Sequence, residues 1–236
     1  MENKGQIALF VLIAAVIVAS AAFIFLIKPE KEVVTPEIMP IQSHVQGCVE
    51  ESSKYALYMI GLQGGYFKLP ELSVEDVAVY FNKNKNTAPR LSTIEQELAA
   101  YVNARLPLCT NFSKFPDFSI EAGKVTSEAK VLNGIVKFNV NWPLTIKKGT
   151  TTQQLKKFNA NIPSRLLAVY NLSIEMTSDQ LDNPELICWS CFANDAVANG
   201  LYIEVPRLGD VTIFKIIDKN VTLLDLPYEY SFAFAY

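Results

Sequence analysis

Histidine is almost absent from this chain of 236 residues, which contains only His44. Serine and cysteine hydrolases use a histidine as general base, so a catalytic triad would have to include this residue. No G-x-S-x-G segment accompanies it, and a surface or capping role explains His44 better. The pair Gly64-Gly65 lacks the lysine of a P-loop and the spacing of a dinucleotide fingerprint, so it predicts a turn. We therefore predict that the protein is not an enzyme and binds no cofactor.

An excess of positive charge is also absent, because 21 lysines and arginines face 24 aspartates and glutamates, for a net charge of −3. Nucleic acids bind to basic surfaces that neutralise their phosphates. The composition therefore argues against a nucleic acid as partner. Internal repeats and low-complexity tracts are lacking as well, which excludes a repeat architecture.

What the sequence does contain is one long apolar run, Gln6–Ile27, without a charged residue. A helix of this length reaches about 30 Å, the hydrocarbon thickness of a bilayer. We predict a single membrane-spanning helix with membrane lipid as its partner. Ala19-Ser20-Ala21 has the small residues of a secretory cleavage site, but the apolar run is longer than such a signal needs. An uncleaved signal anchor explains the length without any processing.

The residues before this run support a third interpretation. Lys4, Gly5 and Gln6 place a basic residue, a glycine and a polar residue directly before the apolar helix. This arrangement resembles the prepilin-type (class III) signal of archaeal pilins and archaellins. The resemblance covers about residues 3–27, and it implies an archaeal source, cleavage after Gly5 and packing of the helix inside a filament. Many members of that family carry a glutamate at the position of Phe10.

Residues 28–40 contain three prolines and five charged residues. Proline interrupts a helix, so this segment predicts an extended linker between the membrane and a folded domain. In the pilin family the anchor helix usually runs unbroken into the head, so the linker favours a tethered domain. The predicted organisation is residues 1–27 for a short stub and membrane helix, then the linker, then an extracytoplasmic domain over 41–236. A division of that domain into a helical part, 41–110, and a β-rich part, 111–236, is left open.

The cysteines and the glycosylation signals indicate on which side of the membrane the domain lies. The four cysteines are Cys48, Cys109, Cys188 and Cys191, and the three N-x-S/T sequons are at Asn111, Asn171 and Asn220. An even cysteine count favours disulfides outside the cytoplasm, and sequons suit a glycosylated surface protein. The simplest pairing joins Cys48 to Cys109 and links two antiparallel helices.

The segment Cys188-Trp-Ser-Cys191 is the one short motif with chemical content. A C-x-x-C at a helix N-terminus stabilises one thiolate, which is the device of thiol–disulfide oxidoreductases. Here the motif follows no strand of a βαβ unit, and we expect it inside a helix, one turn past its start. A structural disulfide is favoured. Free thiols, redox catalysis and a zinc site that borrows Cys48 and Cys109 remain as alternatives.

Periodicity predicts the helices and strands of the domain. The expected helices are Ile41–Ile60 ended by Gly61, a helix from the capping box Ser92–Glu95 to Leu106 stopped by Pro107, one over 163–181, and one over 182–199. The expected antiparallel meander over 118–162 has a two-residue turn at Asn133-Gly134. The other expected strands are Val77–Phe81, paired with a short strand after Gly64-Gly65, and 201–205, 211–217 and 221–236, with turns at Gly209-Asp210 and Asp218–Asn220.

These observations predict an α+β fold, in which an N-terminal transmembrane helix precedes an extracytoplasmic domain of antiparallel sheet with several packed helices. The predicted function is a structural or interaction role at the cell surface, pilin-like, in contact with other protein subunits or surface proteins. A membrane-tethered binding domain that never polymerises is the first alternative. A thiol–disulfide oxidoreductase that uses Cys188 and Cys191 is the second.

Overall fold

The structure is a computed structural model that describes residues 13, 14, 16 and 35–236. The chain divides into two compact units, Met1–Thr35 and Pro36–Tyr236. Among the described residues, no helix is both long enough and apolar enough to cross a bilayer. The processing site at Gly5 and Gln6, most of the apolar run and most of the linker lie outside the described residues, so these features stay predictions.

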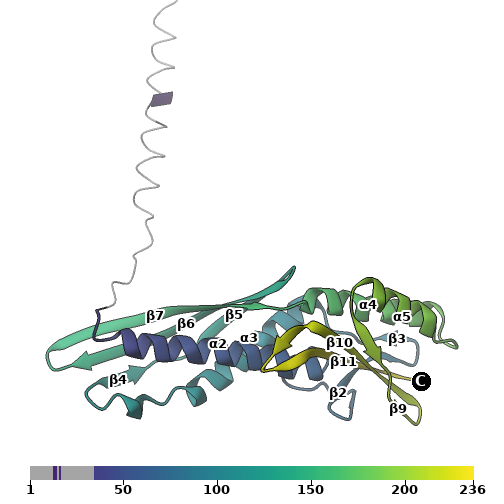
Figure 1. Cartoon of the computed structure of the whole chain (residues 1–236), viewed down its shortest axis with the longest axis horizontal. Coiled ribbons are helices and arrows are strands. Elements are labelled where there is room, and N and C mark those ends of the chain that lie inside the picture. Colours follow the sequence, from purple (N-terminus) through teal and green to yellow (C-terminus); the bar gives the residue numbers. More distant parts are fainter. Residues whose placement is uncertain (1–12, 15, 17–34) are drawn as a thin grey trace, which may run out of the picture. The chain divides into compact units, whose positions relative to one another are not determined.

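The unit Pro36–Tyr236 has the α+β class that the sequence predicts (Figure 1). Its four α-helices are α2 (Met39–Leu62), α3 (Leu91–Cys109), α4 (Leu166–Asp182) and α5 (Trp189–Ala198), and a 3₁₀ turn, η1, covers Phe112–Lys114. One sheet contains β4 (Ser119–Ala122), β5 (Thr126–Leu132), β6 (Ile135–Lys148) and β7 (Thr151–Pro163). The other contains β1 (Ser73–Val74), β2 (Val77–Asn82), β3 (Lys85–Asn86), β8 (Tyr202–Glu204), β9 (Arg207–Leu208), β10 (Val211–Leu223) and β11 (Leu226–Ala235).

Helix α2 contacts both sheets, through β7 along its first part and through β11 further on (Figure 1). One face of α2 is apolar and buried, and Ile41, Val45 and Val49 have no exposed surface. Gly61 does not end the helix, which continues to Leu62. A Cβ atom at Gly61 would collide with the backbone oxygen of Glu229, so this glycine permits close packing against β11.

Helix α3 begins one residue before the predicted capping box, and the box itself does not form. Arg90 is the N-cap residue and makes no side-chain capping bond. The Glu95 carboxylate instead accepts a hydrogen bond from the backbone N–H of Val131 at 3.0 Å and pairs with Lys130. Pro107 does not stop the helix either, since α3 continues to Cys109. Tertiary contacts with β5 thus outweigh the local capping signal.

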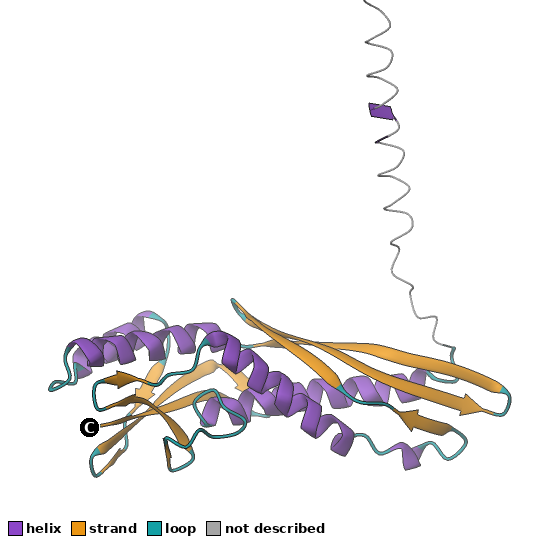
Figure 2. Ribbon diagram, turned by 180° about the vertical axis from the view of Figure 1, so that it is seen from behind, coloured by secondary structure: helices purple, strands orange, loops and turns teal. Residues whose placement is uncertain are grey.

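The sheet β4–β7 confirms the predicted meander and adds a detail. Leu132 pairs with Ile135 across Asn133-Gly134, and Gly134 has the positive φ of 75° that this turn requires. Strand β6 pairs with β5 and then β4 along one edge and with β7 along the other. Helices α2 and α3 pack on one face of this sheet (Figure 2). The exposed polar side chains of the strands lie on the opposite face.

The second sheet departs from the prediction in two places. Strand β2 pairs in parallel with β11 and antiparallel with β1 and β3, so this sheet is mixed, and the strand expected directly after Gly64-Gly65 is absent from the described structure. The turn expected at Asp218–Asn220 is a bulge inside β10. The hairpin turn is Leu224-Asp225, where both residues have positive φ. Asp218 is fully buried and pairs with Arg165 at 3.4 Å, so it lies in the core and not in an exposed turn.

The core of this sheet is aromatic. The alternating side chains Tyr228, Tyr230, Phe232 and Phe234 are buried, but so are Ser231 and Ala233 between them, so both faces of this part of β11 are covered. Phe214 of β10 stacks on Phe232 with ring centroids 5.2 Å apart. These rings form the core, which leaves no aromatic groove along β11.

Candidate functional site

The domain contains two disulfides. Cys48 of α2 is bonded to Cys109 at the end of α3, with Cα atoms 5.7 Å apart, which confirms the predicted pairing. Cys188 is bonded to Cys191. All four cysteines are therefore paired.

The C-x-x-C motif lies at the start of α5, not one turn inside a helix as predicted. Cys188 is the N-cap residue, and Cys191 is exposed in the first turn. The helix starts late because Asn183-Pro184 opens a loop that continues to Cys188. This position is the one in which a helix dipole stabilises a thiolate.

A hollow of about 720 Å³ adjoins this disulfide. Leu186 and Trp189, which line it, are 73% and 43% exposed. Asp179 also lines it, and its carboxylate opposes the negative charge of a thiolate. The peptide bonds of the described residues are all trans, so the described chain has no cis-proline loop beside the motif. Redox catalysis at Cys188 and Cys191 therefore stays a hypothesis.

The structure also locates the remaining residues that the sequence analysis considered. His44 is half-buried within α2, with its ring centroid 5.6 Å from that of Phe115, so it does not cap the helix. Gly64 and Gly65 form the predicted turn, with φ angles of 69° and 88°. Among the described residues, no group of three or more His, Cys, Asp and Glu side chains is arranged to hold a metal ion.

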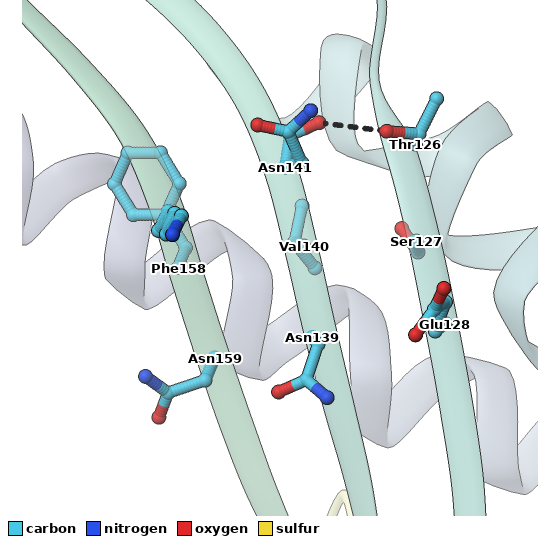
Figure 3. A pocket seen from close by; sticks show the side chains of 9 residues that line it. Thr126, Ser127, Glu128, Asn139, Val140, Asn141, Phe158 and Asn159 are labelled. Carbon is cyan, nitrogen blue, oxygen red and sulfur yellow. Dashed lines mark hydrogen bonds between the residues drawn. The ribbon is translucent and has the colours of Figure 1, made fainter. Parts of the chain in front are cut away.

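A second hollow, of about 560 Å³, lies on the polar face of β5, β6 and β7, and no sequence motif predicted it. The strand register places six exposed side chains there in two rows of three. The rows are Thr126, Asn141, Lys157 and Glu128, Asn139, Asn159. Figure 3 shows the side chains of Asn139 and Asn159 next to each other on neighbouring strands, with helices behind the sheet.

Most of the polar groups in this hollow are free. The side chains of the three asparagines, Glu128 and Lys157 make no hydrogen bond or ion pair with the described residues. The Thr126 hydroxyl donates to the backbone oxygen of Asn141 at 3.3 Å. Three other lysines of this sheet are paired with carboxylates, for example Lys147 with Glu121 at 2.7 Å. The hollow therefore offers hydrogen-bond donors and acceptors without partners in the described chain. Its two charged side chains, Glu128 and Lys157, have opposite signs, so its net charge is zero.

Alternation along β5 and β6 predicts which side chains face water, but not which of them meet across strands. Asn159 lies opposite Asn139 because the turn at Gly149-Thr150 begins the pairing of β6 with β7 and a bulge between Asn141 and Leu144 then shifts the register by one residue. The one sequence feature that could have indicated this hollow is the repetition of asparagine at the outward-facing positions 139, 141 and 159.

The three sequons occupy different environments. Asn111 is exposed before η1, and its side-chain oxygen accepts hydrogen bonds from the N–H and the hydroxyl of Ser113. Asn220 is exposed at the bulge of β10, and Thr222 is exposed as well. Asn171 is exposed on α4, but the hydroxyl residue of its sequon, Ser173, has no exposed surface.

Comparisons with known proteins add no relative, since no family model matches the chain and no curated protein or solved structure matches it significantly.

Proposed function

We propose that this chain is a single-pass, membrane-anchored protein whose domain lies outside the cytoplasm and acts there as a tethered binding domain. The observation that carries the binding role is the hollow on β5–β7, where five side chains from three strands present free polar groups. The apolar run Gln6–Ile27 supports the anchor. The complete pairing of the cysteines supports an oxidising compartment.

The resemblance of Lys4-Gly5-Gln6 to a prepilin-type signal supports processing after Gly5. It also supports a second candidate function, in which copies of the chain assemble into a filament through the apolar helix. The proline-rich linker and Phe10 favour the tethered domain over the filament. Electron microscopy of native membranes distinguishes the two, because filaments that bind an antibody to this chain would support assembly.

The proposed location and processing predict the mass of the mature protein. We expect a chain that starts at Gln6 and lacks four protons, because both disulfides are formed. The measurement is intact-mass and peptide spectrometry of protein taken from its native membrane without reductant. A protease added to intact cells should also digest the domain. Recovery in the soluble fraction, or alkylation of the cysteines before any reductant is added, would contradict the proposed location.

Glycan occupancy gives an independent prediction. We expect glycans at Asn111 and Asn220 but not at Asn171, because the hydroxyl of Ser173 is buried and donates to the backbone oxygen of Tyr170 at 2.7 Å. Glycopeptide mass spectrometry measures the three sites separately. The variants Asn111→Gln and Asn220→Gln should each increase gel mobility, whereas Asn171→Gln should leave it unchanged. Three unmodified sites would count against an extracytoplasmic domain.

A further inference from the structure

The hollow on β5, β6 and β7 has the chemistry of a site for a hydroxyl-rich ligand, and we propose that it binds a neutral oligosaccharide. This proposal deepens the binding role proposed above and rests on it, because a domain outside the cytoplasm meets surface saccharides.

The asparagines determine the kind of hydrogen bonding that the site offers. Each carboxamide carries two N–H donors and one carbonyl acceptor. Sugar hydroxyls donate one hydrogen bond and accept others, so neighbouring amides can satisfy a hydroxyl from both sides. Asn139 and Asn159 lie opposite each other in the strand register, and Asn141 is two residues along β6 on the same face. None of the three side chains has a partner in the described chain.

Charge complementarity indicates that the ligand is neutral. The hollow contains one carboxylate, Glu128, and one ammonium group, Lys157, in different rows. A sulfated or phosphorylated polymer would be attracted to Lys157 but repelled by Glu128. A neutral sugar can use both groups, because a carboxylate accepts and an ammonium donates hydrogen bonds to hydroxyls.

The position of the hollow argues against an extended peptide. Peptides that bind to sheets usually add a strand to an exposed edge and pair with its backbone. Here the central strand β6 is paired with β5 on one side and with β7 on the other. Recognition in the middle of this face therefore depends on side chains alone.

The size of the hollow matches a short oligosaccharide. Three neighbouring strands span about 10 Å, and residues two apart on one strand are separated by about 7 Å. The hollow of about 560 Å³ lies within the range of ligand pockets, roughly 300–1,000 Å³. Val140 and Phe158 also line it, and both are almost fully buried.

The test measures saccharide binding to the full chain by NMR, in micelles of a detergent without a sugar headgroup such as dodecylphosphocholine. The probes are maltotriose, cellotriose, mannotriose and N-acetylchitotriose, with a sulfated heparin oligosaccharide as the anionic comparison. We expect at least one neutral probe to shift the side-chain amide resonances of Asn139, Asn141 and Asn159.

Variants connect the binding to the site. The double substitution Asn139→Ala and Asn159→Ala should weaken binding of that probe by about tenfold or more, because it removes two hydrogen-bonding side chains. Gln154→Ala is the matched control, since Gln154 is exposed on the same strand, β7, but lies outside the hollow. This control should bind as the unaltered protein does, and the amide spectrum of each variant shows whether it is folded.

Three results would overturn the proposal: no shift with any neutral probe, a shift with the sulfated probe alone, or equal binding by the double variant. The proposed location is judged separately, because the protease and mass measurements use cells and native membranes and require no ligand. A correctly located protein that binds none of these sugars would thus reject the saccharide site while leaving the location supported.

Discussion

Replacement of both Cys48 and Cys109 by alanine is expected to lower the free energy of unfolding by about 4 kcal/mol. The disulfide closes a loop with a sequence separation of 61 residues. In the chain-entropy model, opening a loop of this length stabilises the unfolded state by about that amount. The melting temperature of a unit of this size should fall by about 10 °C, which calorimetry of the purified protein measures.

The second disulfide supplies the matched control. Cys188 and Cys191 are only three residues apart, so the same model assigns this bond about 2 kcal/mol, half the effect of the long loop. The exposed Cys191 also makes this bond the easier one to reduce. Limiting dithiothreitol should therefore release the thiols of Cys188 and Cys191 before the melting temperature falls substantially. Equal destabilisation by the two double variants would contradict the loop-length argument.

Turns that contain a glycine with positive φ were predicted correctly from the local sequence. Asn133-Gly134 predicted its hairpin because Gly134 adopts a positive φ of 75°, which glycine reaches without steric cost. Signals that compete with tertiary contacts predicted poorly. Glu95 binds the backbone of β5 and makes no capping box. Asp218 is buried and pairs with Arg165, and the hairpin turn lies at Leu224-Asp225.

The candidate site was less predictable than the fold, because it depends on register between strands that are distant in sequence. Alternation indicated that Asn139 and Asn141 face water, but nothing local places Asn159 beside them. The parallel pairing of β11 with β2 also depends on distant segments, since it joins the end of the chain to a strand in its first half. Periodicity predicts the C-x-x-C motif one turn inside a helix, but the loop after Pro184 extends to Cys188, so the motif lies at the helix start.

A cluster of buried tyrosines should make the domain sensitive to alkali. The Tyr80 hydroxyl donates to the backbone oxygen of Gly64 at 3.0 Å, so Tyr230, whose hydroxyl is 2.6 Å away, donates to Tyr80. Burial raises the pKa of Tyr80 and of Tyr230 above the ordinary value of 10.0. Burial also raises the pKa of Tyr228, whose hydroxyl has no hydrogen-bond partner within the described part of the chain.

The direction of the pH effect follows from these raised pKa values. Above about pH 10 the unfolded chain releases phenol protons that the folded domain still holds, so folding stability decreases as the pH rises. Below that pH both states keep their protons, and this contribution to stability is fully present. Each such tyrosine contributes a slope of about 1.4 kcal/mol per pH unit, so the three together give about 4 kcal/mol per pH unit.

The measurement is the urea midpoint of unfolding between about pH 9 and pH 12, followed by fluorescence and by the ultraviolet absorbance of phenolate. Tyr230→Phe should reduce the alkaline slope by about a third and cost about 1 kcal/mol at neutral pH, because Tyr80 keeps its bond to Gly64. Tyr202→Phe is the matched control, since that ring is 53% exposed. If Tyr230→Phe leaves the alkaline slope unchanged, the buried hydroxyl pair is not the source of the sensitivity. The phenolate absorbance contributed by Tyr80, Tyr228 and Tyr230 should appear together with the loss of native fluorescence, because titration of these buried rings requires the sheet formed by β2, β10 and β11 to open.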